Sequence, residues 1–96
     1  MDQHVASARR IVLDALRGTN AQVYLFGSWA HGKQRRYSDI DIAVLPADPL
    51  PPGLLEDLRA KLDESQILYP VDLVDLTDAP ASLRERVLEE GIRWTE

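Results

Sequence analysis

The stretch GSWAHGKQRRYSDIDIAV, residues 27–44, joins a turn signal to two acidic residues inside an apolar run. Asp39 and Asp41 alternate with Ile40 and Ile42, and residues two apart in a strand point to the same face. The two carboxylates should therefore lie close together. Like charges at that separation disfavour each other's ionisation unless a cation compensates them or that side of the strand is solvated. The stretch thus predicts either a site for a hard cation or a polar strand face.

The residues ahead of the acidic pair favour the first of these interpretations. Gly27 and Ser28 follow a short apolar run and open a turn, whose backbone N–H groups and serine hydroxyl can face phosphate oxygens. A basic trio follows in the same loop: Lys33, Arg35 and Arg36. Each feature alone is more simply a turn glycine or a solvated loop. Together they indicate a phosphate substrate held beside a divalent cation.

A third carboxylate is needed to hold two magnesium ions well, and VDLVDL at residues 71–76 offers Asp72 and Asp75. The two are three residues apart in a predicted strand, so they point to opposite faces. Only one of them can join the acidic pair. Periodicity does not decide which one.

The rest of the chain reads as alternating helices and strands. Apolar spacing predicts helices over residues 2–17, from 54 to 62 or as far as 67, and from 79 or 80 to 91, and strands over 21–27, 39–45 and 71–76. The link between the first two strands is too short for a parallel crossover, whereas the helix before the third permits one. We therefore expect an α/β chain with a small mixed three-stranded sheet flanked by helices.

The end of the chain carries its own expectations. Asp78 can cap the last helix, whose Leu83, Val87 and Leu88 are expected to face inward. The tail that follows contains Ile92 and Trp94, which either close the edge of the core or belong to a partner interface.

Composition excludes several classes of function. The 96 residues contain no cysteine, which excludes a disulfide framework, a thiolate zinc site and a cysteine nucleophile. A formal net charge of -5 argues against binding to long nucleic acid. There is no apolar run near the roughly 20 residues of a membrane span, nor a signal-peptide pattern, so a cytoplasmic protein is expected.

The pattern of Gly27-Ser28, ten intervening residues and Asp39-x-Asp41 resembles the signature of the DNA polymerase beta-type nucleotidyltransferase superfamily. In particular, the chain is similar to the minimal nucleotidyltransferases (MNT proteins) of bacteria and archaea, which are paired with HEPN-domain partners. The opening helix, the signature, VDLVDL and the ending APASLRERVLEEGIRW at 79–94 all stand in the expected order. The resemblance implies the polymerase beta-like nucleotidyltransferase fold, as one minimal domain over residues 1–96.

The resemblance also implies roles for individual residues. The aspartate of the first Val-Asp-Leu after the long helix is implied as the third carboxylate, so Asp72 is preferred to Asp75, and it is placed to help receive the acceptor's proton. The implied catalytic and metal-binding set is Asp39, Asp41 and Asp72. The implied nucleotide-binding set is Gly27, Ser28, Lys33, Arg36 and Ser38, with Arg35 expected to point away.

The function implied by the resemblance is that of an antitoxin enzyme. It would transfer AMP from ATP, with two magnesium ions, to a hydroxyl group, expected to be that of a tyrosine, on a HEPN ribonuclease toxin and so inactivate it. Larger nucleotidyltransferases carry an additional helical domain, so a partner is expected to complete the site here. Two alternatives stay open: an antitoxin that neutralises the toxin by binding alone, and a transferase acting on a small molecule or an RNA end.

Overall fold

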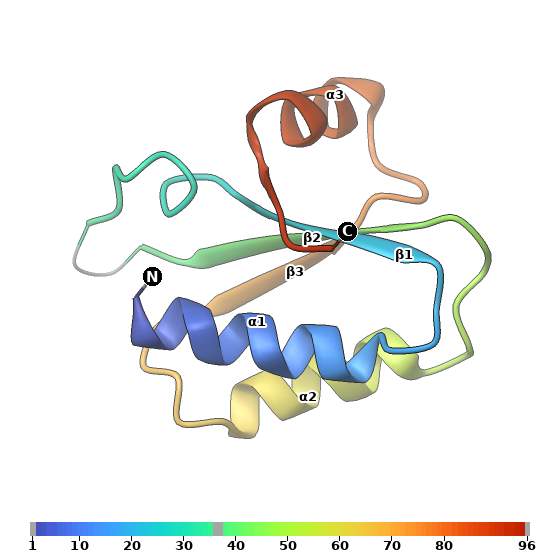
Figure 1. Ribbon diagram of the computed structural model, residues 1–96, viewed down its shortest axis with the longest axis horizontal. Coiled ribbons are helices and arrows are strands. Elements are labelled where there is room, and N and C mark those ends of the chain that lie inside the picture. The colour runs from blue at the N-terminus through green and yellow to red at the C-terminus, as the bar shows by residue number, and fades with distance from the viewer. Residues whose placement is uncertain (1, 36–37, 96) are drawn as a thin grey trace.

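The computed structural model describes residues 2–35 and 38–95 (Figure 1). Within those ranges the helices are α1 (Gln3–Ala15), α2 (Leu54–Glu64) and α3 (Ala81–Glu90), and the strands are β1 (Ala21–Phe26), β2 (Ile40–Pro46), β3 (Val71–Asp75) and β4 (Ile92–Arg93). The α/β class predicted from the sequence is confirmed.

The sheet has the strand order β3-β2-β1-β4. β1 pairs antiparallel with β2 and β2 pairs parallel with β3, which confirms both predicted strand directions. The predicted count of three strands is wrong, because β4 pairs antiparallel with β1 at the edge of the sheet. Both residues of β4 are exposed, so no apolar alternation marks the strand. It is fixed by the chain that follows, where the Trp94 N–H donates to the Val23 carbonyl at 2.8 Å.

Helices cover both faces of the sheet (Figure 1). α1 and α2 lie side by side on one face, where the larger apolar cluster joins them to the strands. α3 lies on the other face, over a smaller cluster of Tyr24, Ala43, Leu76 and Val87. Ala43 and Asp41 are two residues apart in β2, so Asp41 also lies on the α3 face. The smaller cluster leaves room on this face for polar side chains.

The ends of α1 and α3 differ from the predicted bounds. The Asp2 carboxylate accepts hydrogen bonds from the first turn of α1, and the helix stops at Ala15 rather than at residue 17. Pro80, not Asp78, stands at the N-cap of α3, and no side chain caps that helix. Leu88 is 46% exposed, so its predicted inward position is wrong. α3 is short and rests on the sheet mainly through Val87 and Leu83, which leaves Leu88 on its outer side.

Two hydrogen bonds from the Arg84 side chain fix α3 above the sheet. The Arg84 guanidinium donates to the carbonyls of Leu76 and Thr77 at 3.0 and 3.1 Å, which ties the helix to the end of β3. Gly91 ends the helix as predicted, and its N–H donates to the Val87 carbonyl at 2.8 Å. A Cβ atom at Gly91 would lie 2.5 Å from that carbonyl oxygen, so only glycine fits this close approach. In the tail that follows, Trp94 is buried in the core, whereas Ile92 is exposed.

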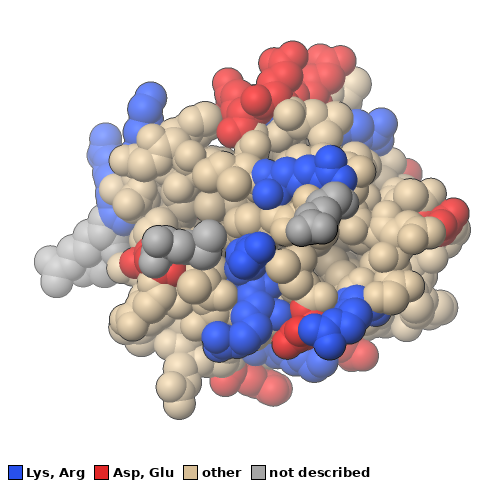
Figure 2. Space-filling view, viewed as in Figure 1, with Lys and Arg blue, Asp and Glu red and all other residues tan. Residues whose placement is uncertain are grey.

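Charge is unevenly distributed over the surface. In Figure 2 acidic side chains gather at the top of the molecule, where α3 lies, and most basic side chains lie across its middle and lower parts. α3 carries the exposed residues Glu85, Glu89 and Glu90. Among the described residues, no helix is long and apolar enough to cross a membrane.

Candidate active site

The turn after β1 packs directly against Asp41. Gly27 adopts φ +74°, a conformation that side chains other than glycine rarely adopt. The turn closes through the Ala30 N–H, which donates to the Gly27 carbonyl at 3.1 Å, and the Lys33 N–H, which donates to the Ser28 carbonyl at 2.9 Å. A Cβ atom at Gly27 would collide with the Asp41 carboxylate. The predicted phosphate turn and the predicted acidic residue therefore form one site.

Strand register brings a second carboxylate beside Asp41. Asp41 is the direct partner of Phe26 on antiparallel β1 and of Asp72 on parallel β3. Asp39 is exposed and directly precedes β2, rather than lying inside the strand as predicted, and it is not among the described residues that line the cavity. The pKa of Asp41 is raised above its ordinary value of 3.8 by burial first, then by the negative charges of Asp72 and Asp39. The charges of Asp72 and Asp39 thus act on Asp41.

Asp75 lies elsewhere. Its carboxylate accepts hydrogen bonds from the Thr77 N–H at 2.9 Å and the Thr77 hydroxyl at 2.6 Å. It borders a separate cavity formed with the proline-rich loop and the start of α2, on the face of the sheet opposite α3. The tertiary structure therefore brings Asp72, and not Asp75, to Asp41.

The three acidic residues fit a hard divalent cation in chemistry. All their donor atoms are oxygens, which magnesium prefers, and burial together with the negative charges of Asp72 and Asp39 raises the pKa of Asp41. Among the described residues no Lys or Arg forms an ion pair with any of the three. Their side chains do not converge on one point, since no group of three described His, Asp or Glu residues is gathered closely enough to hold a metal ion.

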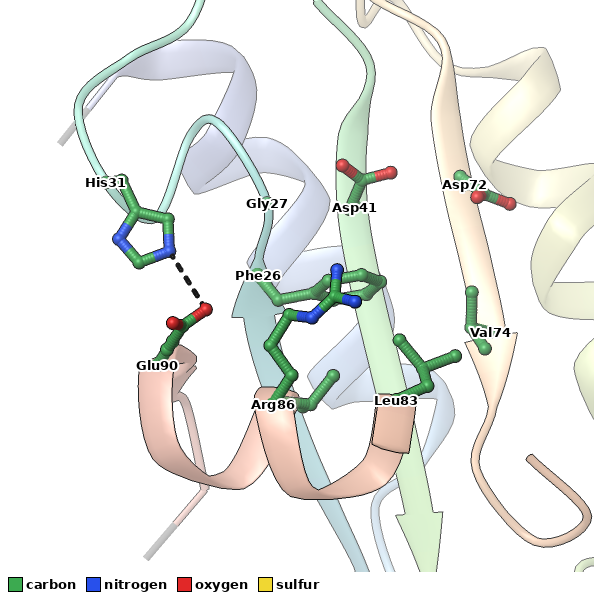
Figure 3. A pocket seen from close by; sticks show the side chains of 10 residues that line it. Phe26, Gly27, His31, Asp41, Asp72, Val74, Leu83, Arg86 and Glu90 are labelled. Carbon is green, nitrogen blue, oxygen red and sulfur yellow. Dashed lines mark ion pairs between the residues drawn. The ribbon is translucent and has the colours of Figure 1, made fainter. Parts of the chain in front are cut away.

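A cavity of about 440 Å³ lies between the carboxylates of Asp41 and Asp72 and α3 (Figure 3). It is lined by Phe26, Gly27, His31, Asp41, Asp72, Val74, Leu83, Arg86, Val87 and Glu90. Sequence reasoning selected neither Arg86 nor Glu90. Their spacing of four residues puts them on one face of α3, but no local pattern shows that this face meets the acidic pair. His31 Nε2 and Glu90 Oε2 lie 3.8 Å apart, so the turn after β1 and α3 approach each other here.

Of the predicted nucleotide-binding residues, Gly27 lines the cavity, whereas Ser28, Lys33 and Ser38 are not among the described residues that line it. Lys33 and Arg35 are exposed in the loop, and Arg36 lies outside the described residues. The Ser38 hydroxyl accepts from the Arg35 N–H at 2.7 Å, and the Ser38 carbonyl accepts from the Trp29 indole N–H at 3.2 Å. Ser38 therefore helps to shape the loop. Its contact with a nucleotide stays a prediction.

Replacing Asp41 with asparagine is expected to stabilise the metal-free protein at neutral pH. The folded state holds this proton more tightly than the unfolded chain, so ionised Asp41 costs stability. That cost is absent below about pH 3.8 and complete above the raised pKa, so the gain should be largest near neutral pH and shrink as the pH falls toward 3.8. Substitutions that remove an unfavourable charge commonly add about 0.5–2 kcal/mol to the free energy of unfolding.

Thermal melting in the presence of a chelator measures this effect. Asp78→Asn is the matched control, because Asp78 is exposed and outside the cavity, and it should bring no gain. Equal melting temperatures for Asp41→Asn and the unchanged protein near neutral pH would contradict the cost assigned to burying ionised Asp41 beside two like charges.

Comparison with known proteins gives a consistent result. A family model described as polymerase beta, nucleotidyltransferase matches residues 18–95. The protein adenylyltransferase MntA of Shewanella oneidensis is 48% identical over 69 residues, which cover 72% of this chain and 49% of that protein. The chain thus spans about half the length of this curated relative.

Two solved structures share the fold at substantial identity. A toxin-antitoxin crystal structure with AMP-PNP aligns with a TM-score of 0.71 at 39% identity, covering 91% of this chain and 72% of that one. A complex of tri-AMPylated Shewanella oneidensis HEPN toxin with an MNT antitoxin aligns with a TM-score of 0.67 at 33% identity, covering 96% of this chain and 69% of that one.

Proposed function

Because the chain belongs to the polymerase beta nucleotidyltransferase family, we propose that it is an antitoxin that transfers AMP from ATP to a tyrosine hydroxyl of a HEPN-domain toxin. The observation that carries this proposal is the Gly27 turn packed directly on Asp41, with Asp72 as the next partner across the sheet. The activity named for the MntA relative and the AMPylated toxin in the similar complex support it.

The transfer exchanges one phosphorus–oxygen bond for another. The acceptor oxygen attacks the α-phosphorus of ATP, and its bond to phosphorus forms as the bond to the bridging oxygen breaks. Pyrophosphate leaves, and the acceptor's proton passes to the Asp72 carboxylate. AMP stays attached to the acceptor.

The residues of the site have separate roles in this transfer. The backbone N–H groups after Gly27 and the Ser28 hydroxyl hold the triphosphate, and Lys33 and Arg36 neutralise part of its charge. Ser38 keeps the loop in shape through its bond to the Arg35 N–H. Two magnesium ions, held by Asp39, Asp41 and Asp72, would lower the pKa of the acceptor hydroxyl and offset charge on the pyrophosphate.

The modification has a physical route to inactivating a nuclease. An added AMP carries negative charge, which repels the phosphates of RNA near the toxin's cleft. In this proposal residues 1–96 form one minimal nucleotidyltransferase domain, and the partner contributes surface to its site. A cytoplasmic location belongs to the same proposal, because ATP, magnesium and an RNA-cleaving toxin meet there.

The test is to incubate the protein with its HEPN partner, labelled ATP and magnesium, and to follow the partner's intact mass. We expect one or more added AMP groups and loss of ribonuclease activity. The control is the double variant Asp39→Asn with Asp41→Asn, which should add none. An unchanged partner mass, or an added mass that persists in the double variant, would overturn the proposal. Neutralisation by the double variant would then indicate an antitoxin that acts by binding alone.

The same assay separates the remaining alternative. Label that appears on a small molecule or on an RNA end in the absence of the HEPN partner would indicate a different acceptor class. We expect no such product, because the proposed acceptor is a side chain of the partner protein.

A further inference from the structure

The cavity beneath α3 has two chemically different ends (Figure 3). Gly27 and His31 lie at one end, where β1 passes into the phosphate turn. Val74 and Leu83 lie at the other, beyond Asp72, and both are half-buried and pack against the small apolar cluster. Asp41 lies between the two ends. The cavity therefore has a polar side at His31 and Glu90 and an apolar wall at Val74 and Leu83, and its lining also includes Phe26 of β1 and Asp72 of β3.

The geometry of displacement at phosphorus indicates which end of the cavity holds the triphosphate and from which end the acceptor approaches. The attacking and leaving oxygens lie roughly in line on opposite sides of the transferred phosphoryl group. If the triphosphate is held by the Gly27 turn, pyrophosphate departs on that side and the acceptor approaches from the side of Asp72 and Val74. β3 is an edge strand, so a partner can reach this side without crossing the rest of the sheet.

We infer that Val74, Leu83 and Arg86 form the acceptor subsite, which takes the aromatic ring of a tyrosine and directs its hydroxyl toward Asp72. This inference rests on the proposed function, since it assumes AMP transfer to a protein side chain. Val74 and Leu83 offer an apolar wall that a ring covers and that a serine side chain is too short to cover.

Arg86 completes the subsite. Its side chain extends from α3 into the cavity in Figure 3, and no described residue forms a hydrogen bond or ion pair with its guanidinium group. A planar guanidinium that keeps its charge packs well on the face of an aromatic ring. Arg84, two residues earlier, is by contrast occupied by the carbonyls of Leu76 and Thr77.

The surroundings of the subsite also favour a particular kind of acceptor surface. Glu85, Glu89 and Glu90 are exposed on α3, and acidic side chains gather over this helix in Figure 2. Opposite charge on a partner speeds encounter and fixes its orientation. The acceptor tyrosine should therefore lie in a basic surface, as expected near the RNA-binding cleft of a ribonuclease.

The first experiment measures transfer rates for Leu83→Ala and Arg86→Ala while the concentrations of the HEPN partner and of ATP are varied separately. The matched controls are Leu88→Ala, on the outer side of α3, and Arg9→Ala, exposed on α1 at the opposite face. We expect the KM for the partner to rise about tenfold in the two subsite variants. The dissociation constant for ATP should stay within about twofold, and the controls should change neither value.

Two further measurements make the outcome decisive. Arg86→Lys should restore only part of the lost affinity for the partner, because an ammonium lacks the planar guanidinium. Replacing the partner's acceptor tyrosine with serine should reduce transfer at least about 100-fold, since the hydroxyl no longer reaches the α-phosphorus in line. Thermal melting of each variant confirms folding, and Arg86, being exposed, is the variant least able to disturb it.

Distinct results separate this inference from the proposed function. Weaker ATP binding with an unchanged KM for the partner would make the cavity a nucleoside subsite and overturn the inference. Equal transfer to serine and tyrosine would also overturn it. Absence of AMP transfer by the unchanged protein would instead contradict the proposed function, and the inference would fail with it.

Discussion

Replacing Asp72 with asparagine is expected to reduce AMP transfer by about 10²- to 10⁴-fold, the usual cost of removing a general base. Asp72 is the direct partner of Asp41 in parallel strands, and its charge raises the pKa of Asp41. An asparagine keeps the shape of the side chain but neither accepts the proton nor carries the charge. Initial rates of AMP incorporation into the HEPN partner measure the loss.

Asp75→Asn is the matched control for this substitution. Asp75 lies on the same strand but on the opposite face, where Thr77 donates both its N–H and its hydroxyl to the carboxylate. We expect this variant to keep transfer within about threefold of the unchanged protein, because surface substitutions away from a site are mostly small in effect. A larger loss in Asp75→Asn than in Asp72→Asn would show that the third carboxylate is misassigned.

Replacing Gly27 with alanine is the second substitution with a large expected effect. The new Cβ would collide with the Asp41 carboxylate, so Asp41 must move out of its place beside Asp72. Displacements of about 1 Å at an active site can cost about 10²-fold in rate. The positive φ of +74° adds about 1–2 kcal/mol of backbone strain. We therefore expect near-complete loss of transfer together with a lower melting temperature.

Gly18→Ala separates these two contributions. Gly18 also has a positive φ, +85°, but a Cβ atom there would meet nothing within 4 Å. This variant should lose similar stability through strain alone and keep its transfer activity. Should both variants lose stability equally while both retain full activity, contact between Gly27 and Asp41 would have no part in catalysis.

Both substitutions depend on one structural relation, the packing of the turn after β1 against β2. The antiparallel pairing of β1 and β2 puts Phe26 directly opposite Asp41, so the residue after Phe26 passes beside the carboxylate. Any side chain at that residue would occupy space that the carboxylate fills. The requirement for glycine therefore comes from the site and not only from the turn.

Local patterns were sufficient for much of the fold. The spacing of apolar residues indicated all three helices, because one face of each packs on the sheet and repeats every three to four residues. Loop length indicated the directions of three strands. β4 could not be predicted from the sequence, because its two exposed residues show no apolar alternation. Its pairing with β1 depends on the next residue, Trp94, being anchored in the core.

For the candidate site, too, some residues could be assigned from local sequence patterns and others could not. Gly27, Ser28, Asp39 and Asp41 could be assigned to one motif from the sequence, because they are close along the chain and the two aspartates alternate as residues of a strand do. Strand periodicity left Asp72 and Asp75 open, and the family resemblance preferred Asp72. The tertiary structure places Asp72 beside Asp41 and shows that Arg86 borders the same cavity. These residues are separated from the motif by some 30 residues or more, and their meeting depends on strand register and on how α3 packs over the sheet. Neither is encoded in a local repeat.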